Sequence, residues 1–564
     1  MVHTCPLNKH NMRKMMMAAL MLLCLSSLCC AQTDKRHLLN VGKNLEIFSQ
    51  VYKHLDLMYV DTISPEEVIG NGIKHMLESL DPYTKYYPES DNTELKMMLT
   101  GKYAGIGAVI RYNQQLKRVV VDEPYEGMPA VEAGLKKGDI ILSIDGEDMN
   151  RKNVSEVSSK LRGEPGTTFT LKIKRPSTNK KMTLKMTRRS IKMPEIPYYG
   201  LLEDSVGYLN LNSYTEGCAK DVRRAFIDLK KQGASKFILD LRENGGGSLS
   251  EAIDIINMWV PKGVTLVETK GKLKEANRAY VTRMEPVDTV MPLVVLVNEN
   301  TASASEITAG SIQDLDRGLV VGTRTYGKGL VQVPVSLPYK ATLKLTTSKY
   351  YIPSGRCIQA INYKHTGGGY TERIADSLTH VFYTRNGREV RDGGGIKPDV
   401  EVRPDTLPNI ALYMERIDST EVMHNFVIDY IASHPTIAPP REFSLTDEDF
   451  EALKQRAIKG GFTYDQITEK KVNELIELAK FEGYYEDAKE LFDQLKAKLK
   501  HNIATDMDRH KQIIKQMVEA DIIPAYYYQR GAIEASIMQD KTVKEALRIL
   551  KDEKGYTQRL RAVK

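Results

Sequence analysis

Apolar residues recur at helical spacing in the first part of the chain beyond residue 32. Between residues 32 and about 100 there are few glycines or prolines, and one apolar face follows steps of three and four, through Leu45, Phe48, Tyr52, Leu55 and Tyr59. Residues three and four apart share one face of an α-helix. The pattern therefore predicts an N-terminal helical region over residues 32–100.

From Tyr103 onward the pattern changes to short β-type runs. Glycine-rich turns separate four runs that are rich in β-branched residues: Ile106–Ile110, Val119–Val121, Ile140–Ile144 and Phe169–Ile173. The stretch from Val154 to Leu161 instead has helical spacing. Short apolar runs between glycine turns are typical of strands. We expect a small β-rich module over residues 101–190.

Residues 191–405 alternate between amphipathic helices and short apolar strands. The strand runs are Phe237–Leu241 and Leu293–Val297, a further helix is expected from about Ser303, and one helical face is formed by Val222, Ala225, Phe226 and Leu229. Such alternation predicts an α/β layer with a buried sheet. Residues 406–564 are helical and highly charged. They predict a C-terminal helical accessory domain whose role the sequence does not state.

The first 31 residues have the composition of a secretory signal peptide. Basic residues precede an apolar stretch of about 16 residues, which ends at Ala31. This stretch is shorter than the roughly 20 residues that a membrane-spanning helix needs. We therefore expect an exported, otherwise soluble protein of a bacterial periplasm. Cys29 and Cys30 raise the alternative of a lipid anchor, which is less favoured because the residues before them are not the usual small ones.

Composition and charge exclude several classes of protein. With 564 residues, 41% of them hydrophobic and 27% charged, the chain has the material for several folded domains. The net charge of +7 is mild, and no Lys/Arg-rich run with interleaved aromatics occurs, so no nucleic-acid partner is expected. Beyond the leader only Cys218 and Cys357 remain of the six cysteines, which excludes a disulfide framework.

Histidine is absent from the part of the chain where chemistry would be expected. The chain has eleven histidines, but none lies between His75 and His365. Zinc motifs are therefore missing from the α/β segment, and we expect no metal and no organic cofactor. If this segment is catalytic, a group other than histidine must take the proton.

Two turns that follow strand runs in the α/β segment carry candidate groups. In FILDLRENGGGSL (237–249), Gly245 to Gly247 precede a helix, and their N–H groups could hold an oxyanion. An ordinary tight connection explains these glycines equally well. In VLVNENTASASEITAGSIQD (295–314), Ser303 stands where the helix begins and could act as a nucleophile. Ser303 and Glu306 also match a capping box, in which the serine only satisfies amides of the first turn.

A third segment, GTRTYGKGLVQVPV (322–335), places Lys328 between two glycines before a β-type run. A lysine in such a loop is usually solvated. It becomes a candidate base because Ser303 lies in a segment without histidine, and a desolvated lysine can accept a proton from a serine hydroxyl. Gln332, four residues further on, would point to the same strand face and could orient the amine through a hydrogen bond.

Together these segments resemble the carboxyl-terminal processing (tail-specific) peptidase family of Ser-Lys serine proteases. The resemblance extends over roughly residues 40–405. It rests on DLRENGGG, on TASASEI followed by AGSIQD, and on YGKGLVQ, in the order and spacing of the family, with further matches in KYYIPSGRCIQ and GGGIKPDV.

The resemblance implies a role for each matching residue. Ser303 would be the nucleophile, Lys328 the general base and Gln332 its orienting partner. The N–H groups of Ala304 and Gly246 would form the oxyanion hole. Gly245 stands where proline is common in the family. This departure leaves the choice of the oxyanion glycine open.

The β-rich module resembles a PDZ domain. Tyr103-Ala104-Gly105-Ile106-Gly107 precedes a β-type run, and AGLKKGDIILSIDG (133–146) matches the central signature. A glycine loop can offer N–H groups to a terminal carboxylate, and the adjoining strand can pair with an extended peptide. An ordinary glycine turn is the alternative. The resemblance implies that Gly105, Ile106 and Gly107 bind peptide.

The implied fold is a multidomain α/β protein. A PDZ-like β-rich module precedes a crotonase-like (ClpP-like) α/β protease core, and the N- and C-terminal regions are helical. The implied function is that of an exported serine endopeptidase that cleaves proteins near their C-termini through an acyl-enzyme. The PDZ-like module would dock substrate tails or gate the activity.

The implied partners are protein or peptide substrates. A homo-oligomer and an activating partner protein are also compatible with the resemblance. Two alternatives remain open. One is a non-catalytic PDZ scaffold with a decayed protease layer, against which Ser303, Lys328 and Gln332 count. The other is an acyl-transfer enzyme or an isomerase on the same α/β fold. The PDZ-like module counts against that second alternative.

Overall fold

The computed structural model describes residues 35–89, 102–360, 375–416 and 418–562. The chain divides into two compact units, Met1–Tyr86 and Tyr87–Lys564, and each is described by itself. The predicted signal peptide, with Cys29 and Cys30, lies outside the described residues. Among the helices that are described, none is both long enough and apolar enough to cross a membrane.

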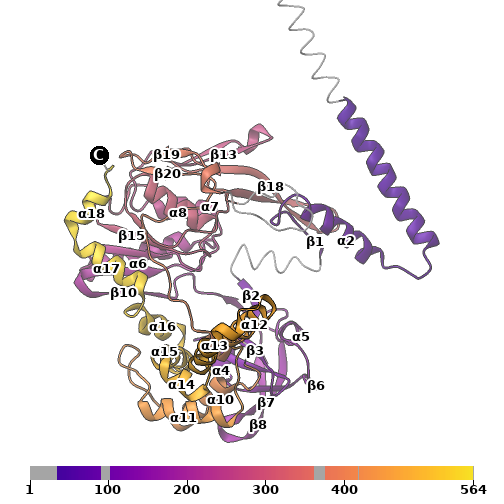
Figure 1. Ribbon diagram of the computed structural model, residues 1–564. Helices are drawn as coiled ribbons and strands as arrows, with labels where there is room; N and C mark the ends of the chain where they lie inside the picture. Colours follow the sequence, from indigo (N-terminus) through magenta and orange to yellow (C-terminus); the bar gives the residue numbers. More distant parts are fainter. Residues whose placement is uncertain (1–34, 90–101, 361–374, 417, 563–564) are drawn as a thin grey trace, which may run out of the picture. The chain divides into compact units, whose positions relative to one another are not determined.

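The first unit is mainly helical. A helix over residues 35–58 is followed by α2 (Pro65–Glu78), and a short strand, β1 (Lys85–Tyr87), begins at its end (Figure 1). The hydroxyl oxygen of Ser64 accepts a hydrogen bond from the N–H of Glu67 at 3.4 Å, and Pro65 occupies the first helical position. Both are common helix-start features, because they satisfy or remove amides that lack a partner inside the helix.

A β-rich module begins the described part of the second unit. Its main sheet has the order β3-β4-β5-β7-β8, and β6 pairs with β5. Strand β2 (Lys102–Gly105) pairs antiparallel with β9 (Arg189–Lys192). The other elements are β3 (Ala108–Asn113), β4 (Arg118–Pro124), α4 (Pro129–Glu132), β5 (Ile140–Ile144), β6 (Glu147–Asp148), α5 (Val154–Leu161), β7 (Thr168–Arg175), η2 (Pro176–Thr178) and β8 (Lys180–Thr187).

Each predicted run of this module overlaps an observed strand, but β4 and β7 extend beyond their runs, and β8 lies outside all of them. The expected run Ile106–Ile110 begins as a strand only at Ala108, because Ile106 and Gly107 form the turn that follows β2. Gly107 has a φ of 72°, which favours glycine. The last strand, β9, ends at Lys192 rather than at residue 190. Ile191 is its only apolar residue, so its sequence carries little strand signal.

The α/β core is built on a sheet of order β10-β11-β12-β15-β16-β21, in which only β10 pairs antiparallel. The predicted run Leu293–Val297 is β15, and Phe237–Leu241 overlaps β12. The elements are β10 (Tyr198–Leu201), η3 (Glu203–Ser205), β11 (Val206–Asn210), α6 (Cys218–Lys231), β12 (Lys236–Asp240), α7 (Leu249–Ile256), β15 (Leu293–Val297), α8 (Ala304–Asp314), β16 (Leu319–Gly322) and β21 (Val400–Glu401).

Alternate residues of the core strands pack into two separate clusters. Leu239 and Val295 pack with residues of α6, α7 and α8, such as Phe226. Ile238 and Leu296, on the opposite face, pack with the C-terminal helix α17 (Lys541–Lys551). Side chains of a strand alternate between faces, so both faces of the sheet are covered, as the buried strand runs require.

A second sheet has the strand order β18-β13-β14, and β17 pairs with β18. Its strands pair antiparallel. The elements of this part are β13 (Thr265–Gly271), η4 (Lys274–Ala276), β14 (Arg278–Val281), β17 (Leu330–Ser336), β18 (Thr342–Tyr351), η5 (Asp376–Leu378), β19 (Val381–Tyr383) and β20 (Glu389–Arg391). The chain leaves the core sheet after β16, and the hairpin of β17 and β18 leads it back toward the core.

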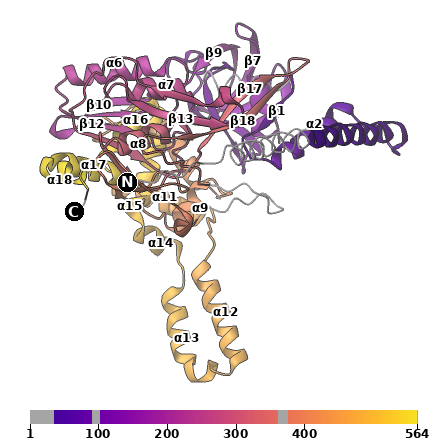
Figure 2. The same ribbon diagram turned by 90° about the horizontal axis from the view of Figure 1, so that it is seen from above.

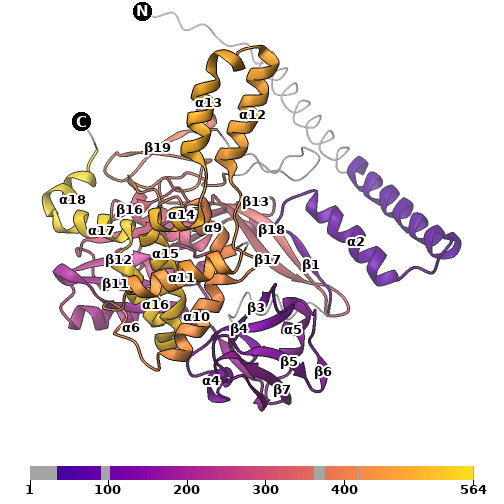
Figure 3. The same ribbon diagram turned by 60° about the horizontal axis from the view of Figure 1, so that its bottom comes forward.

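The C-terminal part consists of helices. Figures 2 and 3 show α12 and α13 as a pair that extends away from the other helices of this part. The elements are α9 (Asn409–Arg416), α10 (Val422–Ser433), α11 (Asp447–Lys459), α12 (Ile467–Glu482), α13 (Tyr485–Leu499), α14 (Ile503–Arg509), α15 (Lys511–Ile522), α16 (Pro524–Ile537), α17 (Lys541–Lys551) and α18 (Glu553–Arg559).

These helices contact the β-rich module as well as the core sheet. The ammonium of Lys137 forms ion pairs with Asp122 in β4, at 2.9 Å, and with Asp521 in α15, at 3.1 Å. Arg111 in β3 pairs with Glu421 at 2.5 Å. The C-terminal helices therefore join the β-rich module and the back of the α/β sheet.

Candidate active site

Ser303 lies between β15 and α8 in a strained backbone conformation. Its φ is 58° and its ψ is −116°, whereas a residue that only caps a helix normally has an extended backbone. A non-glycine residue in such a conformation costs of order 1–3 kcal/mol, and such residues are concentrated at functional sites. The side chain is half-buried, so it remains reachable. The capping box of Ser303 and Glu306 is present as well, so a capping role and a nucleophilic role are compatible at this residue.

The glycine-rich turn after β12 packs directly on the start of α8. Gly246 has a φ of 95°, and a Cβ atom there would lie 2.8 Å from both the Ala304 nitrogen and the Ser303 Cβ. Only glycine fits this close approach. Ala304 is the first residue of α8 and is buried. The structure therefore places Gly246 next to Ser303 and Ala304.

Asn244 organises this contact, and no local motif in the sequence points to this role. Its carbonyl oxygen accepts hydrogen bonds from the N–H of Ala302 at 3.0 Å and from the hydroxyl of Ser305 at 2.9 Å. Its side-chain oxygen accepts from the N–H of Gly246 at 2.9 Å. Asn244 is fully buried, so one residue links the glycine-rich turn to the segment that carries Ser303. The N–H of Gly246 is engaged in this arrangement.

Lys328 lies between β16 and β17 and is half-buried rather than solvated. The neighbouring glycines permit the close approach of another segment. A Cβ atom on Gly327 would lie 2.1 Å from the Cβ of Ala360, and one on Gly329 would lie 2.7 Å from the Gln359 nitrogen. The glycines on either side of Lys328 thus pack directly against Gln359 and Ala360.

Gln332 lies in β17, and its amide donates to the hydroxyl of Thr346 at 3.2 Å. Lys328 precedes the strand, and a register shift separates Val331 from Gln332. Simple strand alternation therefore does not relate the side chain of Gln332 to that of Lys328. The orienting role of Gln332 stays a prediction.

The carboxylate of Glu306 connects the nucleophile segment with the lysine segment. It accepts hydrogen bonds from the N–H of Ser303 at 2.9 Å and from the N–H of Lys328 at 2.8 Å. Burial raises the pKa of Glu306 to about 7, and its hydrogen bonds oppose this shift. In the sequence Glu306 was visible only as one half of a capping box.

In the β-rich module, Gly105, Ile106 and Gly107 form the end of β2 and the following turn. The N–H of Ala130 donates to the carbonyl of Ile106, and the N–H of Tyr125 donates to that of Gly107. Within the described part of the module, β3 stands at the edge of its sheet and pairs only with β4. An edge strand of this kind can pair with an extended peptide.

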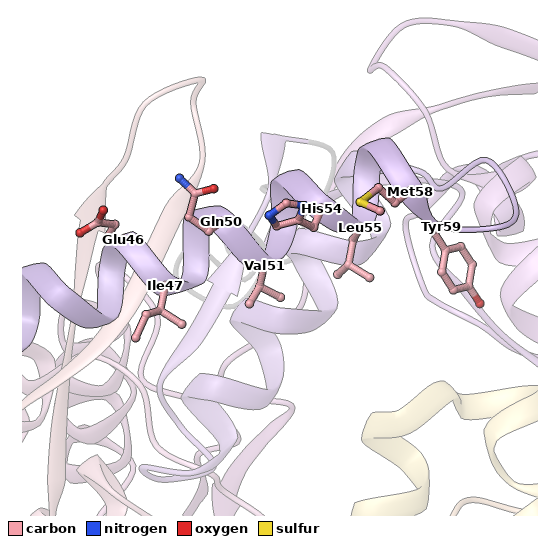
Figure 4. A pocket seen from close by; sticks show the side chains of 8 residues that line it. All are labelled: Glu46, Ile47, Gln50, Val51, His54, Leu55, Met58 and Tyr59. Atoms are coloured by element: carbon pink, nitrogen blue, oxygen red, sulfur yellow. The ribbon is translucent and has the colours of Figure 1, made fainter.

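Two further features of the described residues concern metal ligands and a pocket. No group of three or more metal-ligating side chains occurs among them. An open pocket lies along the first helix, and its lining contains no serine, cysteine or lysine (Figure 4). The lining residues are Glu46, Ile47, Gln50, Val51, His54, Leu55, Met58 and Tyr59.

Comparison with known proteins identifies three regions of the chain. Residues 205–366 match peptidase family S41, and residues 120–175 match the PDZ domain. Residues 413–550 match the domain described as "Probable PDZ-protease, C-terminal helical domain". The S41 match includes Ser303, Lys328 and the glycine-rich turn, and the PDZ match lies in the β-rich module.

Several curated proteins are similar to the chain. The carboxy-terminal-processing protease of Bartonella bacilliformis is 33% identical over 326 residues, which cover 57% of this chain and 74% of that protein. The carboxyl-terminal-processing protease of Picosynechococcus is 37% identical over 277 residues, 48% of this chain and 66% of that protein. Among solved structures, the photosystem II D1 C-terminal processing protease is 28% identical, with a TM-score of 0.36, over 64% of this chain and 88% of that one.

Proposed function

The chain belongs to the carboxyl-terminal processing peptidases of family S41, serine proteases that here carry a PDZ domain, and from this premise we propose that Ser303 and Lys328 form its catalytic dyad. The observation that carries the proposal is the strained backbone of Ser303. The N–H of Ser303 and the N–H of Lys328 both donate to the carboxylate of Glu306. We also infer a crotonase-like core, in keeping with the parallel strands β11, β12, β15 and β16.

The proposed reaction proceeds through an acyl-enzyme. The Ser303 hydroxyl oxygen attacks the scissile carbonyl carbon while the neutral amine of Lys328 takes its proton. The tetrahedral adduct then breaks its C–N bond, and Lys328 returns the proton to the leaving amine. A water molecule then attacks the ester carbonyl carbon while Lys328 takes its proton. The C–O bond to Ser303 breaks, Lys328 returns the proton to the Ser303 oxygen, and the carboxylic acid is released. Gln332 is proposed to orient the amine.

The oxyanion of the tetrahedral adduct is proposed to bind at the start of α8. The N–H of Ala304 is one donor, and Gly246 supplies the second. An oxyanion would have to replace the side-chain oxygen of Asn244, which now accepts from the Gly246 N–H at 2.9 Å. Preorganised N–H donors of this kind typically contribute about 2.7–4 kcal/mol each to transition-state stabilisation.

We propose that the PDZ domain docks the C-terminal tail of a protein substrate. The N–H groups of the Gly105-Ile106-Gly107 turn would receive the terminal carboxylate, and the tail would extend the sheet at the edge of β3. Docking at this site would favour cleavage near the C-terminus of the substrate. A homo-oligomer and an activating partner protein remain predictions from the family resemblance.

We further propose export to the periplasm, on the basic and apolar pattern of residues 1–31. Fractionation of the producing cells, with detection of the protein in each fraction, tests this proposal. A cytoplasmic location would contradict it. Release from the envelope fraction only by detergent would instead favour the lipid anchor at Cys29 or Cys30.

Replacement of the proposed nucleophile tests the dyad. Ser303→Ala should abolish proteolysis and labelling by a serine-directed acylating probe, with no loss of the folded state beyond a change in helix capping. Cleavage at a near wild-type rate would place the nucleophile elsewhere. A wild-type protein that binds tailed peptides but neither cleaves them nor becomes labelled would support the non-catalytic PDZ scaffold.

A further inference from the structure

We propose that Glu306 is a positioning residue for the dyad, because its single carboxylate holds the backbone of the nucleophile and the backbone of the base in one arrangement. Tyr350 holds the same two residues from their carbonyl side. The proposal rests on the proposed function, since it takes Ser303 and Lys328 as the reacting residues. Neither Glu306 nor Tyr350 is proposed to contact the substrate.

The contacts of Glu306 join two segments of the chain. Its Oε2 atom accepts from the N–H of Ser303 at 2.9 Å and from the N–H of Lys328 at 2.8 Å. Its Oε1 atom accepts from the N–H of Gly327 at 2.7 Å and from the hydroxyl of Thr325 at 2.5 Å. The side chain is fully buried in the first turn of α8. A helix cap would need only the first of these four hydrogen bonds.

All four partners of Glu306 are donors. Three are backbone N–H groups, and the Thr325 hydroxyl oxygen itself accepts from the N–H of Ile396 at 2.7 Å, which leaves its proton free to point at Glu306. An ionised carboxylate only accepts, so it matches this set. A carboxamide would place an NH₂ group against N–H donors. In either orientation its NH₂ group faces at least one of these backbone N–H groups, so a carboxamide cannot make all four hydrogen bonds.

Tyr350 supplies the complementary contacts. Its hydroxyl lies 3.3 Å from the carbonyl oxygen of Ser303 and also donates to the carbonyl oxygen of Lys328. Its side chain is 1% exposed, at the end of β18. The N–H groups and the carbonyl groups of the two reacting residues are therefore held by separate buried side chains. The relative position of Ser303 and Lys328 depends on both.

This arrangement makes Glu306 unsuited to proton transfer with the substrate. It is fully buried, and each of its two carboxylate oxygens already accepts two hydrogen bonds. Its effect on the reaction must pass through the placement of the dyad. Misplacement by about 1 Å can cost roughly 100-fold in rate. Loss of the carboxylate should therefore lower kcat and the acylation rate while leaving KM nearly unchanged.

The test compares Glu306→Gln with a matched substitution elsewhere in the chain. Glu519, in α15, is also buried, and it accepts from the N–H of Leu445 at 2.9 Å and from the hydroxyl of Ser444 at 3.0 Å. Single-turnover acylation by a serine-directed probe, peptide-cleavage kinetics and thermal unfolding are measured for both variants. We expect Glu306→Gln to lower the acylation rate about 100-fold with KM within about twofold. Glu519→Gln should change thermal stability only.

Tyr350→Phe keeps the proposal testable if Glu306→Gln does not fold. It removes only the hydroxyl, and we expect a lower kcat at unchanged KM together with a displaced pH–rate profile, since the amine of Lys328 is no longer held in its environment. Wild-type acylation rates in folded Glu306→Gln, or in folded Tyr350→Phe, would overturn the proposal. Activity that persists in Ser303→Ala would instead overturn the proposed function, so the two failures are distinguishable.

Discussion

The guanidinium of Arg242 donates through Nη1 to the carboxylate of Asp540 at 2.6 Å, although 298 positions separate the two residues. Arg242 begins the glycine-rich turn and also donates to Asp240, through Nη2, at 2.6 Å. Asp540 is the N-cap of α17, where its Oδ1 accepts from the N–H of Val543 at 2.9 Å. The C-terminal helix that covers the core sheet is therefore tied to the turn that carries Gly246.

Two substitutions at Asp540 separate its two contacts. Asp540→Asn removes the charge that faces Arg242 but keeps an oxygen that can cap α17, whereas Asp540→Ala removes both. We expect both variants to be less stable than the wild type in urea unfolding. The alanine variant should lose a further 0.5–2 kcal/mol or so through the missing cap. Equal stability of the two variants would contradict the capping role of Asp540.

The buried ammonium of Lys137 should be important for holding the PDZ domain against α15. Its side chain is 5% exposed and pairs with Asp122 and Asp521. Lys137→Ala leaves these two carboxylates next to each other without a cation, which destabilises the folded state by less than the roughly 3–5 kcal/mol of a fully buried pair, because each carboxylate is about a third exposed. The control is Lys152→Ala in the same domain, because the pair of Lys152 with Glu156 is exposed and therefore contributes little to stability.

Calorimetry and limited proteolysis of both lysine variants provide the measurement. Lys137→Ala should unfold at a lower temperature and expose cleavage sites in residues 102–192. Unchanged unfolding of Lys137→Ala would show that the ion pairs do not hold the PDZ domain. The control should behave as the wild type does.

Tail docking predicts that the free carboxylate of a substrate is recognised. A peptide with a C-terminal carboxylate should have a lower KM than the same peptide with a C-terminal amide, and Gly107→Ala should remove this difference. Gly107 has a φ of 72°, and an added Cβ would lie 2.5 Å from the Cβ of Met128, so alanine strains the turn. A preference that survives in Gly107→Ala would contradict docking at this turn.

The protonation of Glu306 should make stability depend on pH. Burial raises the pKa of Glu306 from its ordinary 4.5 to about 7. The folded protein therefore binds this proton more tightly than the unfolded chain, and the contribution to the free energy of unfolding is lost as the pH rises from 4.5 to about 7. Urea unfolding of the wild type should show this loss, and Glu306→Gln should lack it. Parallel pH dependences of the two proteins would show that Glu306 does not titrate in this range.

Much of the core was predictable because its strands are buried on both faces and its helices α6 and α7 on one. The run Leu293–Val297 is β15 without a difference at either end. That α17 covers the second face of the core sheet could not be predicted. Val543, Ile549 and Leu550 show an apolar helical face, but nothing in that face specifies strands more than 200 positions away as its partner.

The candidate site likewise contains residues that the sequence predicts and residues that it does not. Ser303, Lys328 and the glycines carry local motifs, so their residue types and spacing are visible in the sequence. Asn244 and Tyr350 form hydrogen bonds with segments distant in the sequence, and no local pattern predicts such contacts. Glu306 was visible only through its contact with Ser303, since its contact with Lys328 depends on the folding of residues 325–328 around it.

The proposed base is tested most directly by single-turnover acylation of Lys328→Arg. Arginine keeps a positive charge and its proton under all relevant conditions, so it cannot accept the proton of Ser303. We predict that Lys328→Arg is as inactive as Lys328→Ala, although both fold and bind tailed peptides as the wild type does. Appreciable acylation of Ser303 in Lys328→Arg would contradict the Ser-Lys mechanism and would require another base.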